Sequence, residues 1–380
     1  MRKYLFLLMI SFSLTSIAQV TTTKVTPLED FSASNGTVYA LPKASFRIDV
    51  WVEKAEHIKG PYAIYAKKLL GLETIIDYNS KSYSIKNVAI DAEIIADPEQ
   101  LYFVNLGENS EKSDNIKYLQ MNESGLFGGV TATAQTAAIE NQNILIEEII
   151  KGNKDFRYFA DANLIEKTDT IIRRVDIDTS HIEKAIIKKY SVEKDMLQRA
   201  QDAATTLMEI RKNRFELISG YQEVAYSAGT MEIMNGELKQ MEDDYLALFA
   251  GKTVLTDEHY VFYYSPTTDQ PNIIAPVFKF SEQSGVDYLS ASGGEKISLA
   301  IKSNGLAENM NDINTNSAVD GIVYRFPETA EVWVKYGSKE FDKQLMAIPQ
   351  FGKLQKLHFN QNVMELHPTT GGLKLLEVRK

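Results

Sequence analysis

Residues 191–251 read SVEKDMLQRAQDAATTLMEIRKNRFELISGYQEVAYSAGTMEIMNGELKQMEDDYLALFAG, and this stretch decides the fold. Its apolar residues recur at alternating spacings of four and three, which places one narrow stripe along each of two helices. The stripes consist of Met196, Ala200, Ala203, Leu207, Ile210, Arg214 and Leu217 in the first helix, where Arg214 is the one charged member, and Met231, Met234, Leu238, Met241, Tyr245 and Leu248 in the second. The short loop over 220–229 forces the helices antiparallel. We therefore predict a coiled-coil-like helical hairpin.

The sequence on either side of this hairpin has the patterns of β-strands. Residues 44–53 (ASFRIDVWVE) alternate apolar and polar side chains, as half-buried strands do. Gly60-Pro61 and Gly71 bracket one short amphipathic helix. After the hairpin, apolar runs such as 330–336 alternate with turns that contain Gly or Pro. We therefore predict an α+β fold in which the hairpin lies between two β-rich, sandwich-like parts.

These patterns divide the chain into five predicted parts. They are a signal peptide over 1–18, an N-terminal β-rich domain with one short helix over 19–130, a partly extended connector over 131–190, the helical hairpin over 191–251, and a C-terminal β-rich domain over 252–380. We expect residues 19–34 to form a loose leader. Within the connector we expect a short helix over 139–151 and strands over 170–176 and 182–190.

The first residues predict export from the cytoplasm. Arg2 and Lys3 precede a short apolar run, and Ser16-Ile17-Ala18 offers the small residues that signal peptidase recognises. An uncleaved membrane anchor is the alternative, but the apolar run is too short for one. The chain has no cysteine, which excludes a lipid anchor on cysteine, disulfides and thiolate chemistry, and favours a bacterial source.

Charge and hydropathy limit the partners. Removal of Arg2 and Lys3 changes the formal net charge from −10 to −12 (−10 minus 2). An acidic protein without a basic block is a poor ligand for nucleic acid or for an anionic membrane surface. No later segment is long and apolar enough to predict a transmembrane helix. Protein partners in the cell envelope remain, and the ligand is not identified by the sequence.

Two short motifs resemble those of ATPases with coiled-coil arms. Gly251-Lys252-Thr253 resembles the end of a P-loop, and residues 292–296 (SGGEK) resemble an ATPase signature. A P-loop also needs a glycine five positions before Gly251, where this chain has Leu246. Its lysine must open a helix, whereas Gly251 follows one. We therefore interpret Gly251 as a helix stop and residues 292–294 as a turn.

Paired aspartates offer a second enzymatic hypothesis. Asp176 and Asp178 have the spacing of the nucleophile and general acid in haloacid-dehalogenase phosphatases. In those enzymes the pair follows a buried strand, but here Arg173 and Arg174 lie just before it, without alternating strands and helices around it. A solvated acidic turn is the favoured interpretation.

The histidines give no convergent site. They are His57, His181, His259, His358 and His367. The nearest carboxylates in sequence lie in Asp257-Glu258-His259 and in the pair Glu365 and His367, which a strand would place on one face. A zinc or acid–base site needs further convergent groups. We therefore predict no catalytic, cofactor-binding or metal-binding residues and no cofactor.

The hairpin residues allow two interpretations as well. Met231, Met234 and Met241 form either an adaptable binding face or core that packs against the small side of the first helix, and core is favoured. Arg211, Lys212 and Arg214 end the first helix, and acidic residues line the second. Because the helices are antiparallel, we expect these charges to pair within the hairpin.

Several segments together resemble a known family. They are residues 60–71 (GPYAIYAKKLLG), 210–217 (IRKNRFEL), 245–253 (YLALFAGKT) and 321–327 (GIVYRFP). In these segments the chain resembles a family of exported Bacteroidetes proteins known only as a domain of unknown function. The resemblance covers most of the mature chain. It implies a location in the cell envelope and no activity or cofactor.

We therefore expect a non-enzymatic envelope protein, periplasmic or held at the outer membrane by a partner. The alternative is a secreted hydrolase or carbohydrate-binding module that uses Trp51 or Trp333 with nearby carboxylates. A third hypothesis is export to the cell surface, because residues 372–380 resemble a type IX sorting signal.

Overall fold

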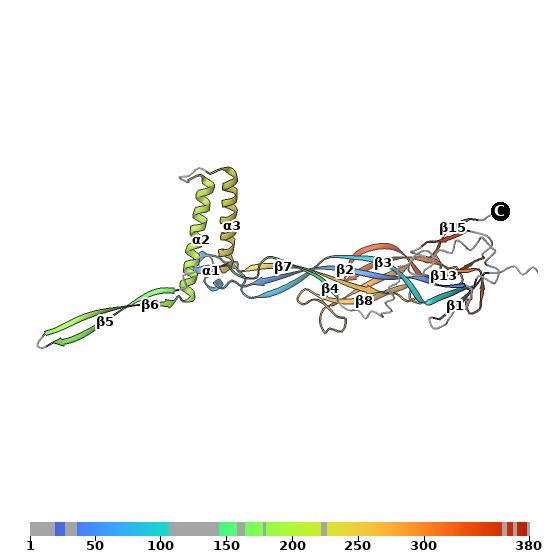
Figure 1. The fold of residues 1–380 in the computed structure, drawn as a ribbon, viewed down its shortest axis with the longest axis horizontal. Helices are drawn as coiled ribbons and strands as arrows, with labels where there is room; N and C mark the ends of the chain where they lie inside the picture. Colours follow the sequence, from blue (N-terminus) through green and yellow to red (C-terminus); the bar gives the residue numbers. More distant parts are fainter. Residues whose placement is uncertain are drawn as a thin grey trace, which may run out of the picture.

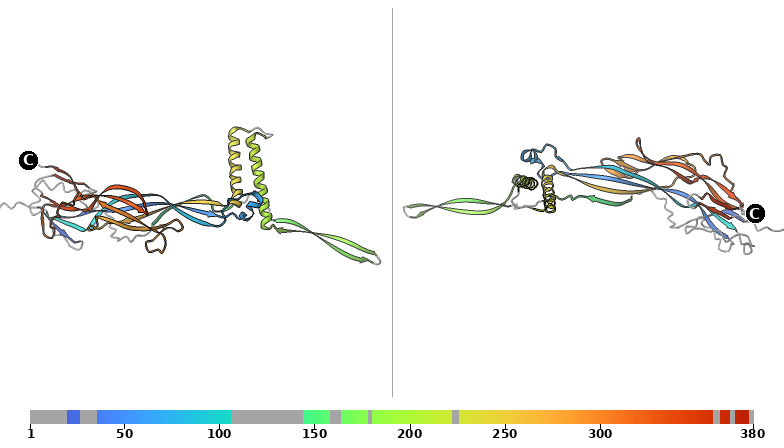
Figure 2. Two further views of the ribbon diagram at one scale, coloured as in Figure 1. Left: turned by 180° about the vertical axis from the view of Figure 1, so that it is seen from behind. Right: turned by 90° about the horizontal axis from the view of Figure 1, so that it is seen from above.

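The computed structural model describes residues 20–26, 36–105, 144–157, 164–177, 180–221, 226–358, 363–367 and 371–377. An elongated β-rich body continues into a narrow ribbon, from which a helical hairpin and a β-hairpin project (Figures 1 and 2). The predicted α+β class with a helical hairpin is confirmed. The predicted signal peptide lies outside the described residues.

A six-stranded antiparallel sheet runs through the body and the ribbon, in the order β11-β1-β3-β2-β7-β4. Its strands are β1 (Thr21–Val25), β2 (Gly36–Ile58), β3 (Ser80–Asn105), β4 (Ile144–Lys151), β7 (Lys252–Tyr264) and β11 (Val319–Asp320). Along β2, Phe46, Ile48 and Val50 are fully buried, as the alternation predicted. The expected loose leader over 19–34 is wrong in its first part, because β1 pairs with both β3 and β11.

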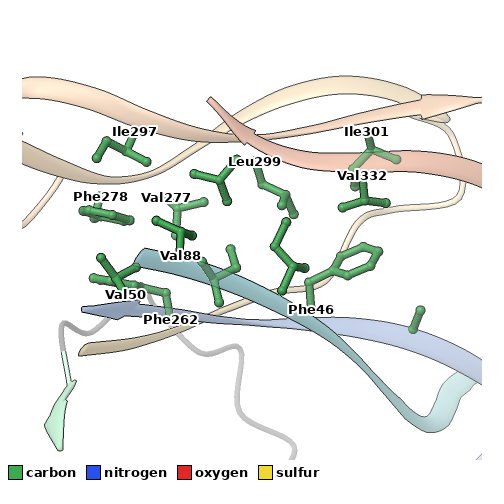
Figure 3. Packing of buried hydrophobic residues seen from close by; sticks show 14 of the residues in the cluster. Phe46, Val50, Val88, Phe262, Val277, Phe278, Ile297, Leu299, Ile301 and Val332 are labelled. Atoms are coloured by element: carbon green, nitrogen blue, oxygen red, sulfur yellow. The ribbon is translucent and has the colours of Figure 1, made fainter. Parts of the chain in front are cut away.

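A five-stranded sheet, in the order β13-β12-β10-β8-β9, packs face to face against the first. Its strands are β8 (Asn272–Ser281), β9 (Gly285–Asp287), β10 (Glu295–Ser303), β12 (Ile322–Tyr336) and β13 (Lys339–Leu357). Figure 3 shows Phe46, Val50 and Phe262 of the first sheet facing Val277 and Leu299 of the second. The rings of Phe262 and Phe278 stack 4.2 Å apart. A separate pair, β14 (Val363–Leu366) and β15 (Leu373–Glu377), completes the strands at the end of the body.

The two β-rich parts share the first sheet. Strand β7 begins directly after the helical hairpin, but it pairs with β2 from Phe46↔Tyr264 to Ile58↔Lys252. The predicted boundary between an N-terminal domain over 19–130 and a C-terminal domain over 252–380 therefore does not follow the sheets. The long strand β2 has two edges, and β3 covers only one of them. Strand β7 covers the other.

The connector contains strands only, as far as the structure describes it. The predicted helix over 139–151 is wrong, because residues 144–151 form β4 at the edge of the sheet beside β7. The apolar, β-branched run ILIEEIIK fits helix and strand periodicity alike, and pairing with β7 decides for the strand. The strands predicted over 170–176 and 182–190 are confirmed as parts of β5 (Leu164–Ile177) and β6 (Ser180–Glu193).

The helical hairpin consists of α2 (Met196–Ser219) and α3 (Ala228–Ala250). Asp195 and Gln198 form a capping box at the start of α2, since each side chain accepts a hydrogen bond from the other's backbone N–H. The predicted short helix is confirmed as η1 (Ala63–Tyr65) with α1 (Ala66–Leu70), which ends at Gly71 in a left-handed conformation. Among the described residues, no helix combines the length and apolar composition needed to cross a membrane.

Candidate interaction surfaces

The base of the helical hairpin is fixed to the ribbon. An apolar cluster joins α1 to both long helices and contains Tyr62, Ala66, Ala200, Ala203, Leu207, Ile210, Tyr245, Leu248 and Phe249. Two backbone hydrogen bonds reinforce it, from Tyr62 to Leu248 (2.8 Å) and from Ile76 to Ala250 (2.8 Å). The backbones also meet closely at Gly60, where a Cβ would lie 2.4 Å from the carbonyl oxygen of Leu248. Apart from Met196, which is 54% exposed, the stripe predicted from the heptad spacing is therefore core at this end.

The three methionines of the second helix, Met231, Met234 and Met241, are all half-buried. Met241 also packs against the basal cluster. Leu217, the stripe residue of α2 nearest the tip, is buried at 1% exposure. These observations support the interpretation of the methionines as hairpin packing, and that packing continues toward the tip.

The predicted charge pairing between the helices is confirmed for Arg211 and Arg214, whereas Lys212 lies 3.8 Å from Glu216 of its own helix. Arg211 Nε lies 2.9 Å from Glu242 Oε1, and Arg214 Nη1 lies 2.8 Å from Glu242 Oε2. Arg214 Nε also donates to Asn235 Oδ1 at 3.1 Å. Partial burial of Glu242 tends to raise its pKa, but the hydrogen bonds from both arginines outweigh burial and hold this pKa below its ordinary value. These charges therefore brace the two helices against each other.

The far end of the hairpin carries exposed apolar side chains, which we call the tip patch. It consists of Phe215, Ile218, Tyr221 and Ile233, with exposed fractions between 62% and 80%. Residues 222–225 of the connecting loop lie outside the described part. Single exposed apolar residues are common, but a group at the end of a projecting arm is typical of a docking site.

A polar cluster lies on the sheet face turned away from the core. Asp49 Oδ1 lies 2.7 Å from His259 Nε2 and accepts a hydrogen bond of 2.9 Å from Arg47 Nη2. The ring of Trp51 stacks on the ring of His259, with centroids 4.8 Å apart and planes 2° from parallel. This cluster was not predicted from the sequence. The available signal was the run of outward-facing positions 47, 49 and 51 on β2, but its partner comes from β7.

Two carboxylates of this cluster, those of Asp49 and Asp257, are held in ion pairs, and Glu147 of β4 lies opposite His259. Asp49 is engaged by Arg47 and His259, and the next carboxylate along the same face of β7 is Asp257. Hydrogen bonds from Lys151 and Lys86 hold the pKa of Asp257 below its ordinary range. A general acid at neutral pH needs a raised pKa instead. The arrangement is a network of ion pairs across the sheet surface.

Trp333 likewise lacks the open ring that a sugar-stacking platform requires. Lys343 Nζ lies 4.9 Å above the centroid of the Trp333 ring, and the same ammonium group pairs with Glu331 at 3.2 Å. A cation over the ring stabilises this surface locally. It also occupies the face on which a ligand would stack.

The remaining histidines lie apart from one another. His57 is within hydrogen-bond distance of Thr253 (2.9 Å), and His358 of Asp320 (3.0 Å). His367 is exposed at the end of β14, while the side chains of Glu365 and His181 lie outside the described part. Across the described residues, no group of three His, Cys, Asp or Glu side chains could hold a metal ion.

The ATPase-like motifs have the structures expected of a helix stop and a turn. Gly251 ends α3 with a φ of 81°, and Lys252 opens strand β7 rather than a helix. The Lys252 ammonium lies 4.6 Å from the ring centroid of Phe156. Residues 292–294 precede strand β10 as a bend. Neither motif therefore offers the helix N-terminus that binds phosphate.

Asp176, the first of the two aspartates, lies at the far end of a β-hairpin. Asp176 is opposite His181 in the β5–β6 register, and Asp178 lies outside the described residues. A phosphatase of the expected type would have the pair at the carboxyl end of a strand in a parallel sheet. An antiparallel two-stranded hairpin does not provide that environment.

Two strand surfaces complete the candidate interaction sites. In the part of the chain that the structure describes, strand β4 is the last strand of its sheet, and it exposes Leu145, Ile146, Ile149 and Ile150. Strands β5 and β6 pair only with each other within the described part and project beyond the helices (Figure 1). Natural proteins rarely leave an apolar edge uncovered, and an isolated two-stranded hairpin is only marginally stable in water.

Comparison with known proteins gives a family and no activity. The model of the family "Domain of unknown function (DUF4831)" matches residues 35–373. No curated protein and no solved structure matches the chain.

Proposed function

The chain belongs to the DUF4831 family, a domain of unknown function, and we propose on that premise that it is an exported cell-envelope protein of structural or binding type. It acts in the periplasm or at the outer membrane of a Bacteroidetes bacterium, as a component of an envelope assembly. The charged start and apolar run of residues 1–18 motivate export. The resemblance to exported Bacteroidetes proteins motivates the location.

The observation that carries the binding role is the tip patch on a fixed base. Phe215, Ile218, Tyr221 and Ile233 are exposed at one end of the hairpin, while the other end is locked by the basal cluster. A rigid arm loses little conformational freedom when its end is bound. Aromatic side chains are enriched where proteins bind other proteins. The hydrolase or carbohydrate-binding alternative has less support, because the Asp49 and Asp257 carboxylates near Trp51 are engaged in ion pairs and Lys343 covers one face of the Trp333 ring.

A photo-crosslinking experiment in living cells tests this proposal. A photoreactive amino acid replaces Phe215 at the tip, and in a matched strain it replaces Gln201, an exposed residue near the base of the same helix. We expect an adduct with a different envelope protein from position 215 and none from position 201. Fractionation should recover the protein with the envelope. Recovery only as a free soluble monomer, without a tip adduct, contradicts the proposal.

A further inference from the structure

We propose that strand β6 of one copy pairs antiparallel with edge strand β4 of the next copy, which joins the molecules head to tail into an open-ended filament. The inference names one partner of the envelope protein and so rests on the proposed function. It concerns surfaces separate from the tip patch. Both strands are described over the region in question, and no other described strand pairs with the outer edge of either one.

The side chains of the two strands are complementary in one antiparallel register. When Glu147 is placed opposite Lys189, Glu148 falls opposite Lys188 and Ile149 opposite Ile187. Both glutamates, both lysines and both isoleucines are exposed in the single chain. Opposite charges and apolar pairs directly across strands each contribute about 0.2–1 kcal/mol. Ile146 then meets Tyr190, next to the β-bulge that β4 forms between Leu145 and Glu147.

The same residues disfavour pairing of β4 with itself. In full antiparallel overlap of two β4 strands, Ile144 lies opposite Lys151 and Glu147 lies opposite Glu148 twice. Like charges directly opposite each other destabilise a ladder. Strand β4 therefore selects a partner with basic residues between apolar ones. Residues 187–190 of β6 (IKKY) have this pattern.

The ion pairs that Glu148 and Lys189 form within one chain are too weak to compete with pairing between two copies. Glu148 lies 3.9 Å from Lys54, and Lys189 lies 3.4 Å from Glu166. The side chains of Glu148, Lys189 and Glu166 are each at least 40% exposed, and ion pairs in such positions contribute little. Rearranging them costs correspondingly little when a partner strand arrives.

Addition to β4 also solves the stability problem of the β5–β6 hairpin. Alone, the hairpin buries little surface, since most of its described side chains are exposed. Joined to β4, it extends a six-stranded sheet by two further strands and satisfies one row of backbone N–H and C=O groups on each partner.

Strand direction determines which copy supplies β6. Within one chain, β4 is antiparallel to β7, which starts at the helical hairpin, so β4 runs toward that hairpin. Strand β6 also runs toward the hairpin, because α2 follows it. Folding β6 back onto its own β4 would give a parallel pair. Figure 1 shows β6 and β4 on opposite sides of the helical hairpin, so the two strands run in opposite directions along the long axis. The β6 of a second copy with the same orientation, shifted along this axis, would therefore meet β4 antiparallel.

This geometry predicts an open assembly. A two-fold axis perpendicular to the long axis would reverse the second copy and make the strands parallel. A shift with unchanged orientation is heterologous, and repeated shifts continue without closing. One end of each filament presents a free β4 edge, and the other presents a free β5–β6 hairpin.

Charge exchange tests the proposal on the full mature chain. One variant carries Glu147→Lys and Glu148→Lys, and another carries Lys188→Glu and Lys189→Glu. Sedimentation velocity and negative-stain electron microscopy measure the assemblies. We expect filaments from the unmodified chain, monomers from each variant alone, and filaments again when the two variants are mixed. The mixture restores assembly because, when the two variants alternate along a filament, β4 and β6 carry opposite charges at every junction.

This design separates assembly from folding, since a misfolded variant cannot be rescued by mixing. A chain that carries all four exchanges should also form filaments. An unmodified chain that stays monomeric, or variants that assemble alone as well as the unmodified chain, overturn the proposal. The crosslinks from position 215 are measured in the monomeric variants, so failure of the filament and failure of the proposed function are distinguishable.

Disulfide formation tests the register. The chain has no cysteine, so any disulfide that forms must join the introduced cysteines. A mixture of Ile149→Cys chains and Ile187→Cys chains should yield a disulfide-linked dimer under mild oxidation. The control mixture pairs Ile149→Cys with Tyr190→Cys, which lies three positions out of register. Equal dimer yield in the two mixtures overturns the register, and dimer only in the first supports it.

Discussion

Arg325 and Asp97 form an ion pair inside the body, where almost no part of either side chain is exposed. Arg325 Nη2 lies 3.5 Å from Asp97 Oδ2, and Nη1 donates to the carbonyl oxygen of Pro42 at 3.0 Å. Burial holds the pKa of Arg325 below its ordinary value, because desolvation disfavours the charge despite the neighbouring carboxylate. The pair therefore links β12 to the first sheet. Because neither charge can reach water, loss of one member leaves the other charge buried without compensation.

Removing one member of this pair is expected to be costly. Asp97→Asn leaves the Arg325 charge buried without compensation, so we expect a loss of about 3–5 kcal/mol in the free energy of unfolding. Urea denaturation measures the effect. The matched control is Glu73→Gln in the exposed pair with Lys67, which should leave stability unchanged. Equal effects of the two substitutions would contradict the role of burial.

Two glycines predict opposite effects at the helical hairpin. In Gly60→Ala the new Cβ meets the backbone oxygens of Leu248 and Ala247, so the joint must shift, at a cost of about 1–3 kcal/mol. Gly236 lies inside α3 with open space around it, so Gly236→Ala should stabilise the helix by about 0.5–1 kcal/mol. Thermal denaturation followed by circular dichroism compares them. A neutral Gly60→Ala would show that the close approach is unimportant.

The ion pairs of Glu242 make the helical hairpin sensitive to acid. The folded-state pKa of Glu242 lies below its ordinary value of 4.5. Its stabilisation is therefore fully present above about that pH and is lost as the pH falls through the lowered folded-state pKa. Protection of α3 amides against hydrogen exchange, measured relative to the intrinsic rate at each pH, should therefore decrease in that acidic window. In Glu242→Gln this loss of protection should be smaller, and an unchanged profile would contradict the assignment.

The isolation of the β5–β6 hairpin predicts that its removal spares the rest of the fold. We expect a chain with residues 164–193 replaced by a short Gly/Ser linker to keep the unfolding midpoint of the body, because these strands pair only with each other within the described residues. Urea denaturation and far-ultraviolet circular dichroism check this expectation. The same chain should form no filaments. A large loss of stability would mean that the hairpin packs against the body.

The elements that sequence predicts best are those decided by neighbours in the chain. The stripes of α2 and α3, the alternation of β2 and the stop at Gly251 all follow from spacing within one segment. Strand β4 was predicted as a helix because its run of eight residues fits both periods, and only β7 settles the choice. Partners that are remote in sequence leave no local signal.

The contacts at the candidate surfaces also fall into two groups, those that one segment of sequence predicts and those that depend on remote strands. The pairing of Arg211 and Arg214 with Glu242 was predictable, because an antiparallel hairpin has a known register. The stacking of Trp51 on His259 was not, because it depends on β2 and β7 becoming neighbours. The free edges of β4 and β6 likewise become visible only once the strand order is known.

At the scale of the whole molecule, the elongated shape gives a direct measurement. A compact chain of 380 residues would have a radius of gyration of about 21 Å. The body, ribbon and β-hairpin lie in line (Figure 2), so we expect a clearly larger value. Small-angle X-ray scattering of the monomeric Glu147→Lys/Glu148→Lys variant measures it. A value near that of a compact chain would mean that the β-hairpin folds back.

The pairing of β2 with β7 also sets an order of events in time. The chain completes β2 at Ile58 and β7 only at Tyr264. At a synthesis rate of roughly 5–20 residues per second, the interval is about 10–40 s. During it, one side of β2 has no hydrogen-bonding partner, and a holding chaperone has its longest opportunity to bind there. Contacts between strands so remote in sequence also form slowly in refolding. The time for which β2 lacks this partner during synthesis is therefore set by the number of residues between β2 and β7.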